Sequence, residues 1–271
     1  VGCSTRTWKS FGFRLAQSKR YLCNMETLGS IYDLCAFGAH PDDVESYAGG
    51  TLAKSVAQGK RVAIVDLTQG ELGTRGTAAT RASESAVALK ILGAEHRENL
   101  NLGDGFFEVN ERSLHTVIEV LRRLRPRMVL ANALDDRHPD HGRGAELIHR
   151  AAFLSGLVKI ETVDTDSGVA QLPWRPQAVY HGIQDRWREP TVVVNIEGFE
   201  KVKAKAIAAY ATQFHQVDAE EKGPQTPIST PEFLTHLEAR DVAMGRLAGL
   251  QRAEGFETKR PPAVDDLGHL G

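Results

Sequence analysis

Short apolar runs alternate with segments of helical periodicity from residue 31 onward. Apolar runs bounded by turn residues are typical of buried strands, and apolar positions three and four residues apart predict amphipathic helices. The pattern predicts strands at residues 31–37, 61–67, 98–100 and 128–132. It predicts helices at residues 47–58, 79–92 and 111–124, the last ended by Pro126. Such alternation predicts a doubly wound, parallel α/β sheet with right-handed crossovers.

The second half of the chain is less regular. Residues 162–176 are rich in turn formers and predict a surface loop. Apolar runs at residues 177–183 and 191–196 precede a helix predicted at 198–212, and a loop with the sequence "EEKGPQTPIST" leads to a helix at 231–250. We expect the proline-broken stretch "EGFETKRPPAVDDLG" to lie over the surface. No linker divides the chain, so residues 25–271 are expected to form a single domain.

Composition narrows the class of partner. The 33 basic and 35 acidic residues give a net charge of −2, which lacks the positive field that nonspecific nucleic-acid binding requires. No apolar run is long enough to span a bilayer. We therefore expect a small-molecule substrate, no nucleic-acid or membrane partner, and a cytoplasmic location.

The first 24 residues differ from the rest of the chain. They hold five Lys or Arg and no acidic residue, and they precede Met25. An organelle-targeting presequence has this composition, but the segment lacks a clean amphipathic period. We favour the alternative, an extraneous or disordered extension. Cys3, Cys23 and Cys35 form no CxxC pair, and Cys35 is expected to be a buried strand residue.

Several nucleotide and hydrolase motifs are missing. The turn after the first predicted strand reads "GAHPDD", with no GxGxxG for a pyrophosphate. Neither a GxxxxGK[ST] loop nor a GxSxG elbow occurs in the sequence. Imidazole and carboxylate groups occupy this turn instead.

His-Pro-Asp occurs twice, in "AFGAHPDDVE" at residues 36–45 and in "DRHPDHGR" at residues 136–143. Each copy follows a predicted strand, so both should lie at the carboxyl edge of the sheet, where such folds bind ligands. Two imidazoles and a carboxylate suit a catalytic divalent metal such as Zn²⁺, with one position left for water. We interpret His40, Asp43 and His141 as the metal ligands.

The remaining side chains of the two motifs then have catalytic roles. Asp42, beside the metal but not bound to it, is placed to be a general base for water. His138 can face the substrate carbonyl from the other side, stabilise the oxyanion as an imidazolium and protonate the leaving amine. We expect Asp140 to hold His138 in its charged form.

The stretches "AHPDDVE", "GGTLAK" and "RHPDHGR" resemble the LmbE/PIG-L superfamily of zinc-dependent de-N-acetylases of N-acetylglucosamine conjugates. The resemblance covers about residues 31–262 and implies a Rossmann-like sheet with a smaller C-terminal layer, assembled as a homo-oligomer, often a hexamer. It implies one divalent ion, Zn²⁺ with Fe²⁺ as the alternative. It assigns the same ligands, base and electrophilic histidine, and places Tyr210 near the oxyanion.

The stretches "DLTQGELGTRGTAATRASES" and "AYATQF" resemble more narrowly the bacillithiol branch, which converts N-acetylglucosaminyl-malate to glucosaminyl-malate and acetate. Arg81 and Arg137 match substrate-contacting positions of that branch, and an Arg fork pairs well with the malate carboxylates. Arg75 is equally well explained as surface charge. The alternatives are a deacetylase of chitooligosaccharides or another amino sugar, a mycothiol-type conjugate amidase, and a sugar-binding module without turnover.

Overall fold

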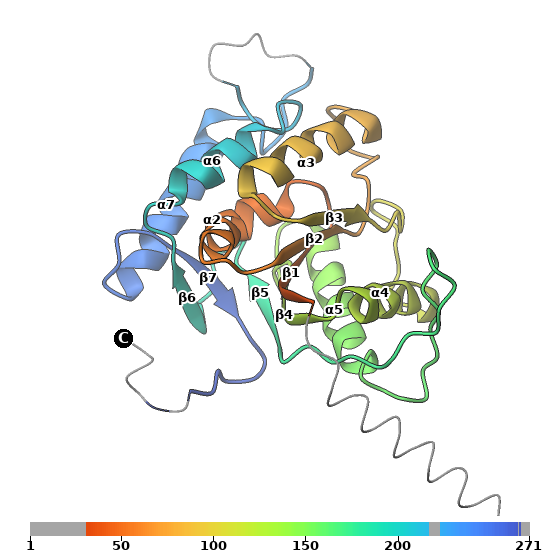
Figure 1. Ribbon diagram of the computed structural model, residues 1–271. Helices are drawn as coiled ribbons and strands as arrows, with labels where there is room; N and C mark the ends of the chain where they lie inside the picture. Colours follow the sequence, from red (N-terminus) through yellow and green to blue (C-terminus); the bar gives the residue numbers. More distant parts are fainter. Residues whose placement is uncertain (1–30, 217–222, 265, 267–271) are drawn as a thin grey trace, which may run out of the picture.

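A seven-stranded mixed sheet is the frame of the computed structural model, which describes residues 31–216, 223–264 and 266 (Figure 1). The strand order is β3-β2-β1-β4-β5-β7-β6. The strands are β1 (Tyr32–Gly38), β2 (Val62–Asp66), β3 (His96–Asn99), β4 (Pro126–Ala131), β5 (Ala178–Gly182), β6 (Val192–Asn195) and β7 (Ala253–Glu257). The first five pair in parallel, and β7 runs antiparallel to both β5 and β6.

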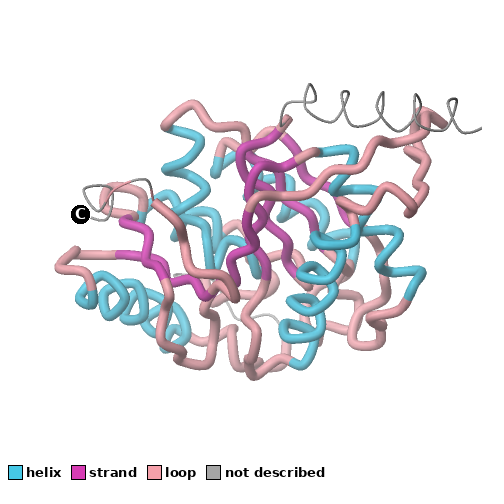
Figure 2. Tube along the Cα trace, turned by 90° about the horizontal axis from the view of Figure 1, so that it is seen from below, coloured by secondary structure: helices cyan, strands magenta, loops and turns pink. Residues whose placement is uncertain are grey.

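Helices cover both faces of the sheet (Figure 2). Side chains of β1 alternate between two cores: Cys35 and Phe37 pack with α4 and α5, whereas Leu34 and Ala36 pack with α2 and α6. A strand buried on both faces reads as a continuous apolar run, as β1 does. The helices are α2 (Asp43–Ala57), α3 (Ala78–Leu92), α4 (Glu111–Leu124), α5 (Pro139–Leu154), α6 (Glu200–Ala208) and α7 (Pro231–Leu247). None of them, within the described part of the chain, is long and apolar enough to cross a membrane.

The predicted α/β fold class is confirmed, and the strands of the first half lie within two residues of their predicted starts. Helix α2 begins at Asp43, four residues earlier than predicted. Helix α5 was not predicted as a separate element, and α6 is shorter than the predicted helix. Cys35 is fully buried, as expected. The predictions for residues 1–24, including Cys3 and Cys23, lie outside the described residues.

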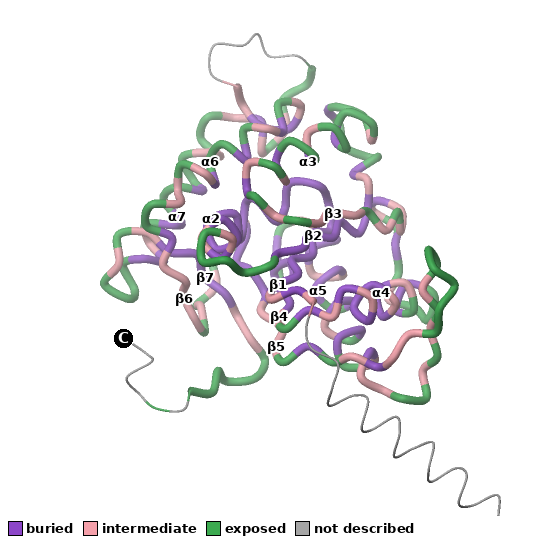
Figure 3. The backbone as a smooth tube through the Cα atoms, in the orientation of Figure 1, coloured by how far each residue is buried: buried purple, intermediate pink, exposed green. Residues whose placement is uncertain are grey.

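The C-terminal stretch departs from expectation. Residues predicted to lie over the surface include β7, which is almost wholly buried between β5 and β6 (Figure 3). Its sequence, AEGFE, shows no clear alternation of apolar and polar residues, because the charged Glu254 lies at a buried position. Glu254 is 1% exposed, and its carboxylate accepts hydrogen bonds from the backbone N–H groups of Gly50 and Thr51 at 2.9 and 2.7 Å.

A buried ionic cluster joins β7 to the helices of the C-terminal layer. The Lys203 ammonium on α6 lies 2.9 Å from Glu254 and 2.7 Å from Asp241 on α7. All three side chains are almost completely buried. Burial of two carboxylates is tolerable because one ammonium lies between them.

Replacement of Lys203 by Met should therefore be strongly destabilising. It leaves two buried carboxylates without their shared cation, which typically costs about 3–5 kcal/mol of unfolding free energy. The matched control is Lys205→Met, two residues along the same helix and exposed to solvent, which should cost less than about 0.5 kcal/mol. Urea unfolding of both variants measures the difference, and equal midpoints would contradict the role given to the cluster.

Candidate active site

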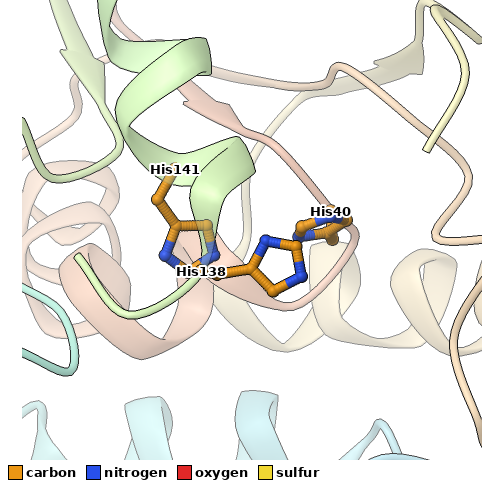
Figure 4. Close-up of side chains that lie close together, drawn as sticks. All are labelled: His40, His138 and His141. Carbon is orange, nitrogen blue, oxygen red and sulfur yellow. The ribbon is translucent and has the colours of Figure 1, made fainter. Parts of the chain in front are cut away.

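The two His-Pro-Asp segments meet at the carboxyl edge of the sheet. One follows β1 and the other follows β4, the strand paired beside it. The ring centroid of His138 lies 4.6 Å from that of His40 and 5.2 Å from that of His141 (Figure 4). Segments about a hundred residues apart in the sequence therefore form one cluster.

A strained turn presents the first segment. A Cβ atom at Gly38 would lie 2.9 Å from the carbonyl oxygen of His40, so the strand can end in this turn only with glycine. Asp42 has a φ of 120°, a left-handed conformation that costs a non-glycine residue energy and is concentrated at functional sites. Helix α2 begins at the next residue, Asp43. The turn thus places Asp42 and Asp43 in different surroundings.

His138 occupies the N-cap of α5, directly before Pro139. Its Nδ1 accepts the backbone N–H of Asp140 at 3.3 Å, so a neutral ring carries its proton on Nε2. Burial lowers the pKa of His138, and the neighbouring His40 and His141 lower it further. This differs from the expected imidazolium: His138 is arranged as a neutral donor.

Asp140 also differs from expectation. Its buried carboxylate accepts the N–H of Gly105 at 2.8 Å, pairs with Arg143, and lies 3.5 Å from Nε2 of His40. Both oxygens are therefore engaged away from the ring of His138. Asp140 ties α5 to the loop after β3, and its charge also raises the pKa of His138 against the opposing effects of burial, His40 and His141.

The donor set fits a divalent metal ion. Nε2 of His141 lies 3.0 Å from one oxygen of Asp43, and Nδ1 of His40 lies 3.5 Å from the other. Nitrogens of His40, His138 and His141 lie within 4.8 Å of one another, and oxygens of Asp104 and Asp140 form a second group with His40. Imidazole and carboxylate in this combination are the usual ligands of catalytic zinc.

The charges around these histidines favour a cation. Burial alone would lower the pKa of His141, but Asp43 and Asp136 raise it to about 9. Burial opposes the charge on His40 as well, yet hydrogen bonds with Asp104, Asp140 and Asp43 raise its pKa well above the usual range. In the metal-free protein, protons on these two rings balance the negative charge of the surrounding carboxylates. A bound divalent ion would balance that charge in their place.

Several supporting residues escaped the sequence interpretation. Asp136 binds Nδ1 of His141, which leaves Nε2 toward Asp43. The side chains of Asn132 and Gln184 donate to the two oxygens of Asp43. Asp104 lies 3.0 Å from His40. A signal existed for Asp104 and Asp136, since each follows a strand at the same edge of the sheet.

Arg81 lies against Asp42, with its guanidinium 2.9 Å from the carboxylate. The same side chain donates to the carbonyl oxygens of Pro41 and Gly70. A Cβ at Gly70 would lie 1.9 Å from a guanidinium nitrogen, so glycine is needed for this approach. Burial raises the pKa of Asp42 to about 7, with Arg81 opposing and Asp43 reinforcing the rise.

A cavity of about 460 Å³ opens above the cluster and is lined by His40, Asp42, Asp43, His138 and His141, among others. Arg81 and Arg137 both line it. The Arg137 side chain is 45% exposed and pairs with Asp185, whereas Arg81 is buried.

Tyr210 is not among the residues that line the cavity. It is fully buried and donates to Glu45 at 3.1 Å, in the core between α3, α6 and α7. The described structure thus places Tyr210 away from the substrate position expected for it.

The chain is similar to known de-N-acetylases. The family model PIG-L, GlcNAc-PI de-N-acetylase, matches residues 35–152, which include both His-Pro-Asp segments. Diacetylchitobiose deacetylase of Thermococcus kodakarensis is 25% identical over 70% of this chain and 73% of its own. The 1D-myo-inositol 2-acetamido-2-deoxy-alpha-D-glucopyranoside deacetylase of Rhodococcus opacus is 27% identical over 65% of this chain and 79% of its own.

Among solved structures, the conserved protein TT1542 from Thermus thermophilus is similar over most of this chain. Its TM-score is 0.75 at 32% identity, over 86% of this chain and 97% of that one.

The raised pKa of Asp42 should make the unfolding free energy of the metal-free protein depend on pH. The folded state holds a proton on Asp42 up to about pH 7, whereas the unfolded state releases it near 3.8. The parent should therefore lose unfolding free energy, relative to Asp42→Asn, as pH rises between these values, by about 1–4 kcal/mol in total. Urea unfolding of chelator-treated parent and variant across this range gives the difference, and a constant difference would show an ordinary pKa.

Proposed function

The chain belongs to the PIG-L (GlcNAc-PI de-N-acetylase) family, and we propose that it hydrolyses the N-acetyl group of an N-acetylglucosamine conjugate, releasing acetate and a free amine. The observation that best supports this proposal is the placement of Asp42. Its carboxylate is buried, lines the cavity, and stands beside a set of metal-type ligands with His138 close by.

His40, Asp43 and His141 would hold one divalent ion, Zn²⁺ or alternatively Fe²⁺. When bound, this ion supplies Lewis acidity, which polarises a carbonyl and acidifies water. Asp136 orients His141 through Nδ1, while Asn132 and Gln184 orient the carboxylate of Asp43. Such supporting bonds fix the ligand geometry before an ion arrives.

Asp42 takes the proton from the attacking water. Its pKa is about 7 in the metal-free site, and a divalent ion beside it would lower that value, which leaves the carboxylate ionised and available as a base at neutral pH. Arg81 keeps the carboxylate oriented through their contact at 2.9 Å. Asp42, once protonated, can deliver the proton to the leaving nitrogen.

His138 stabilises the negative charge that develops on the carbonyl oxygen. The backbone N–H of Asp140 occupies Nδ1, so Nε2–H is the donor available to the cavity. A neutral donor already oriented in this way needs no rearrangement as the oxyanion forms.

Within this class we propose N-acetylglucosaminyl-malate as the substrate. Its deacetylation is a step of bacillithiol biosynthesis. Support comes from Arg137, a half-exposed guanidinium at the cavity that can exchange Asp185 for a substrate carboxylate. The relatives named for chitobiose and inositol conjugates make those the competing substrates. Amine release from a panel of the malate, inositol and chitobiose conjugates tests the choice, and no release from any of them would refute the deacetylase proposal.

Replacement of Asp42 by Asn should abolish most turnover while the metal content is retained. The loss should be about 10²–10⁴ in kcat, the usual contribution of a general base. Asp135→Asn is the control, because Asp135 is a nearby but exposed carboxylate. Elemental analysis and amine release are measured together, and a fully active Asp42→Asn variant would exclude the base role. Chelation of the parent should remove activity, and added Zn²⁺ should restore it.

The two arginines should respond differently to replacement. Arg137→Ala should lower kcat/KM for the malate conjugate about tenfold to a hundredfold, because a charge-assisted bond of about 1.5–3 kcal/mol is lost. Plain N-acetylglucosamine, which has no carboxylate, should be hydrolysed almost as before. Arg81→Ala should slow both substrates alike, because Arg81 holds Asp42. Equal losses on both substrates for Arg137→Ala would remove the support for malate.

A further inference from the structure

A second cavity, of about 590 Å³, lies at the opposite edge of the sheet from the His-Pro-Asp cluster. Its walls come from the starts of β4 and β5, from the second half of α5, and from the chain that follows β7. We call it the back cavity; it is lined by Met128, His149, Ala152, Phe153, Arg175, Pro176, Gln177, Ala178, Val179, Tyr180, Thr258, Lys259, Arg260, Pro261, Pro262 and Ala263. None of these residues contributes to the proposed deacetylase chemistry.

The back cavity is lined by basic side chains and by no acidic side chain. Arg175, Lys259 and Arg260 line it, and the lining contains neither Asp nor Glu. No ion pair joins any of the three to an acidic side chain within the described residues. Elsewhere the described arginines are commonly paired, as Arg97 is with Glu45 and Asp66. Three cations around one hollow therefore create a positive potential that an anion would neutralise.

Two histidines behind this positive charge have unsatisfied nitrogens. Nδ1 of His149 and Nε2 of His181 are buried and have no hydrogen-bond partner. The two rings lie 5.9 Å apart, and His181 is fully buried. Nδ1 of His181 lies 3.1 Å from the carbonyl oxygen of Asn132, to which it donates, so Nε2 is an acceptor. Buried polar atoms without partners are uncommon in folded proteins and call for an explanation.

Lys259 lies close enough to influence both rings. Burial lowers the pKa of His149, and the positive charge of Lys259 lowers it further. Burial likewise brings the pKa of His181 to about 4, with His149 and Lys259 adding to the effect. Both imidazoles are therefore neutral at pH 7, and Nδ1 of His149, the ring that lines the cavity, is free to hydrogen-bond a ligand hydroxyl.

The other walls are apolar. Met128, Ala178 and Tyr180 of β4 and β5 line it, as do Pro261 and Pro262 of the chain after β7. The β7 ladder reaches β5 only at His181 and Gly182, so the earlier part of β5 is unpaired on the side away from β4, where it borders the cavity. Apolar walls beside a few convergent polar groups are typical of small-molecule sites.

We propose that the back cavity binds a small anionic metabolite. Its phosphate or carboxylate group would be held by Lys259, Arg260 and Arg175, its body would rest on the apolar walls, and a hydroxyl would reach Nδ1 of His149, the histidine that lines the cavity. This inference is independent of the deacetylase proposal, because the two cavities share no residue.

Titration of the metal-loaded protein by NMR, with inorganic phosphate in one arm and citrate in the other, tests the proposal. The imidazole resonances of His149 should shift with saturation in at least one arm, which also decides between a phosphate and a carboxylate ligand. Lys259→Gln should weaken that binding about tenfold or more, because a charge-assisted bond is lost. Lys90→Gln, which removes an exposed lysine on α3, should leave the binding unchanged.

Amine release by Lys259→Gln should equal that of the parent, which shows that the variant folds and that the catalytic cavity is intact. If neither probe shifts His149, or if both bind parent and Lys259→Gln equally well, the back cavity is not an anion site. Equal inhibition of parent and variant by phosphate, without a shift at His149, would place the anion in the catalytic cavity and overturn the proposal.

Discussion

Asp42 and Asp43 are adjacent in the chain and both are buried, yet their surroundings move their pKa values in opposite directions. Burial raises the pKa of both carboxyls; contacts with His141 and His40 then bring that of Asp43 well below its usual range. For Asp42, Arg81 and His40 oppose burial while Asp43 and Glu45 reinforce it, so its pKa stays near 7. Opposite shifts in neighbouring groups suit the separate roles proposed here, Asp43 as a ligand and Asp42 as a base, and the strained backbone at Asp42 turns the two carboxylates into different surroundings.

The position of Asp43 depends on parts of the chain far from either motif. Gln184, just after β5, donates to Asp43 and accepts from Asn132 and the backbone of Ala133. Its own carbonyl oxygen accepts from Arg240 on α7, which also reaches the carbonyl oxygen of Ser46 on α2. Since the Lys203 cluster joins α6 and α7 to β7 of the sheet, the C-terminal layer takes part in fixing the site.

The sequence predicted what local pattern determines, namely the alternating elements of the first half and the edge at which both motifs lie. Prediction from the sequence was wrong where a side chain contacts residues that are distant in the chain. The stretch that begins at Glu254 was expected to lie over the surface, but Glu254 is buried because its partners, Lys203 and the N–H groups of α2, are distant in sequence. Asp140 is two residues from His138 but bonds to the loop at Gly105. Tyr210 likewise turns to Glu45, a contact that no spacing rule predicts.

We propose that the chemistry and the choice of substrate reside in different parts of the chain. The family model ends at residue 152 and includes every proposed ligand, Asp42 and His138. The lining of the same cavity also includes Gln213, Phe214 and residues 226–228, all beyond that limit. In the proposed function, the residues up to 152 would carry out amide hydrolysis, and these later residues would contact the aglycone. Arg137 is the exception, because it lies within the matched region and lines the cavity, where its charge would select among aglycones.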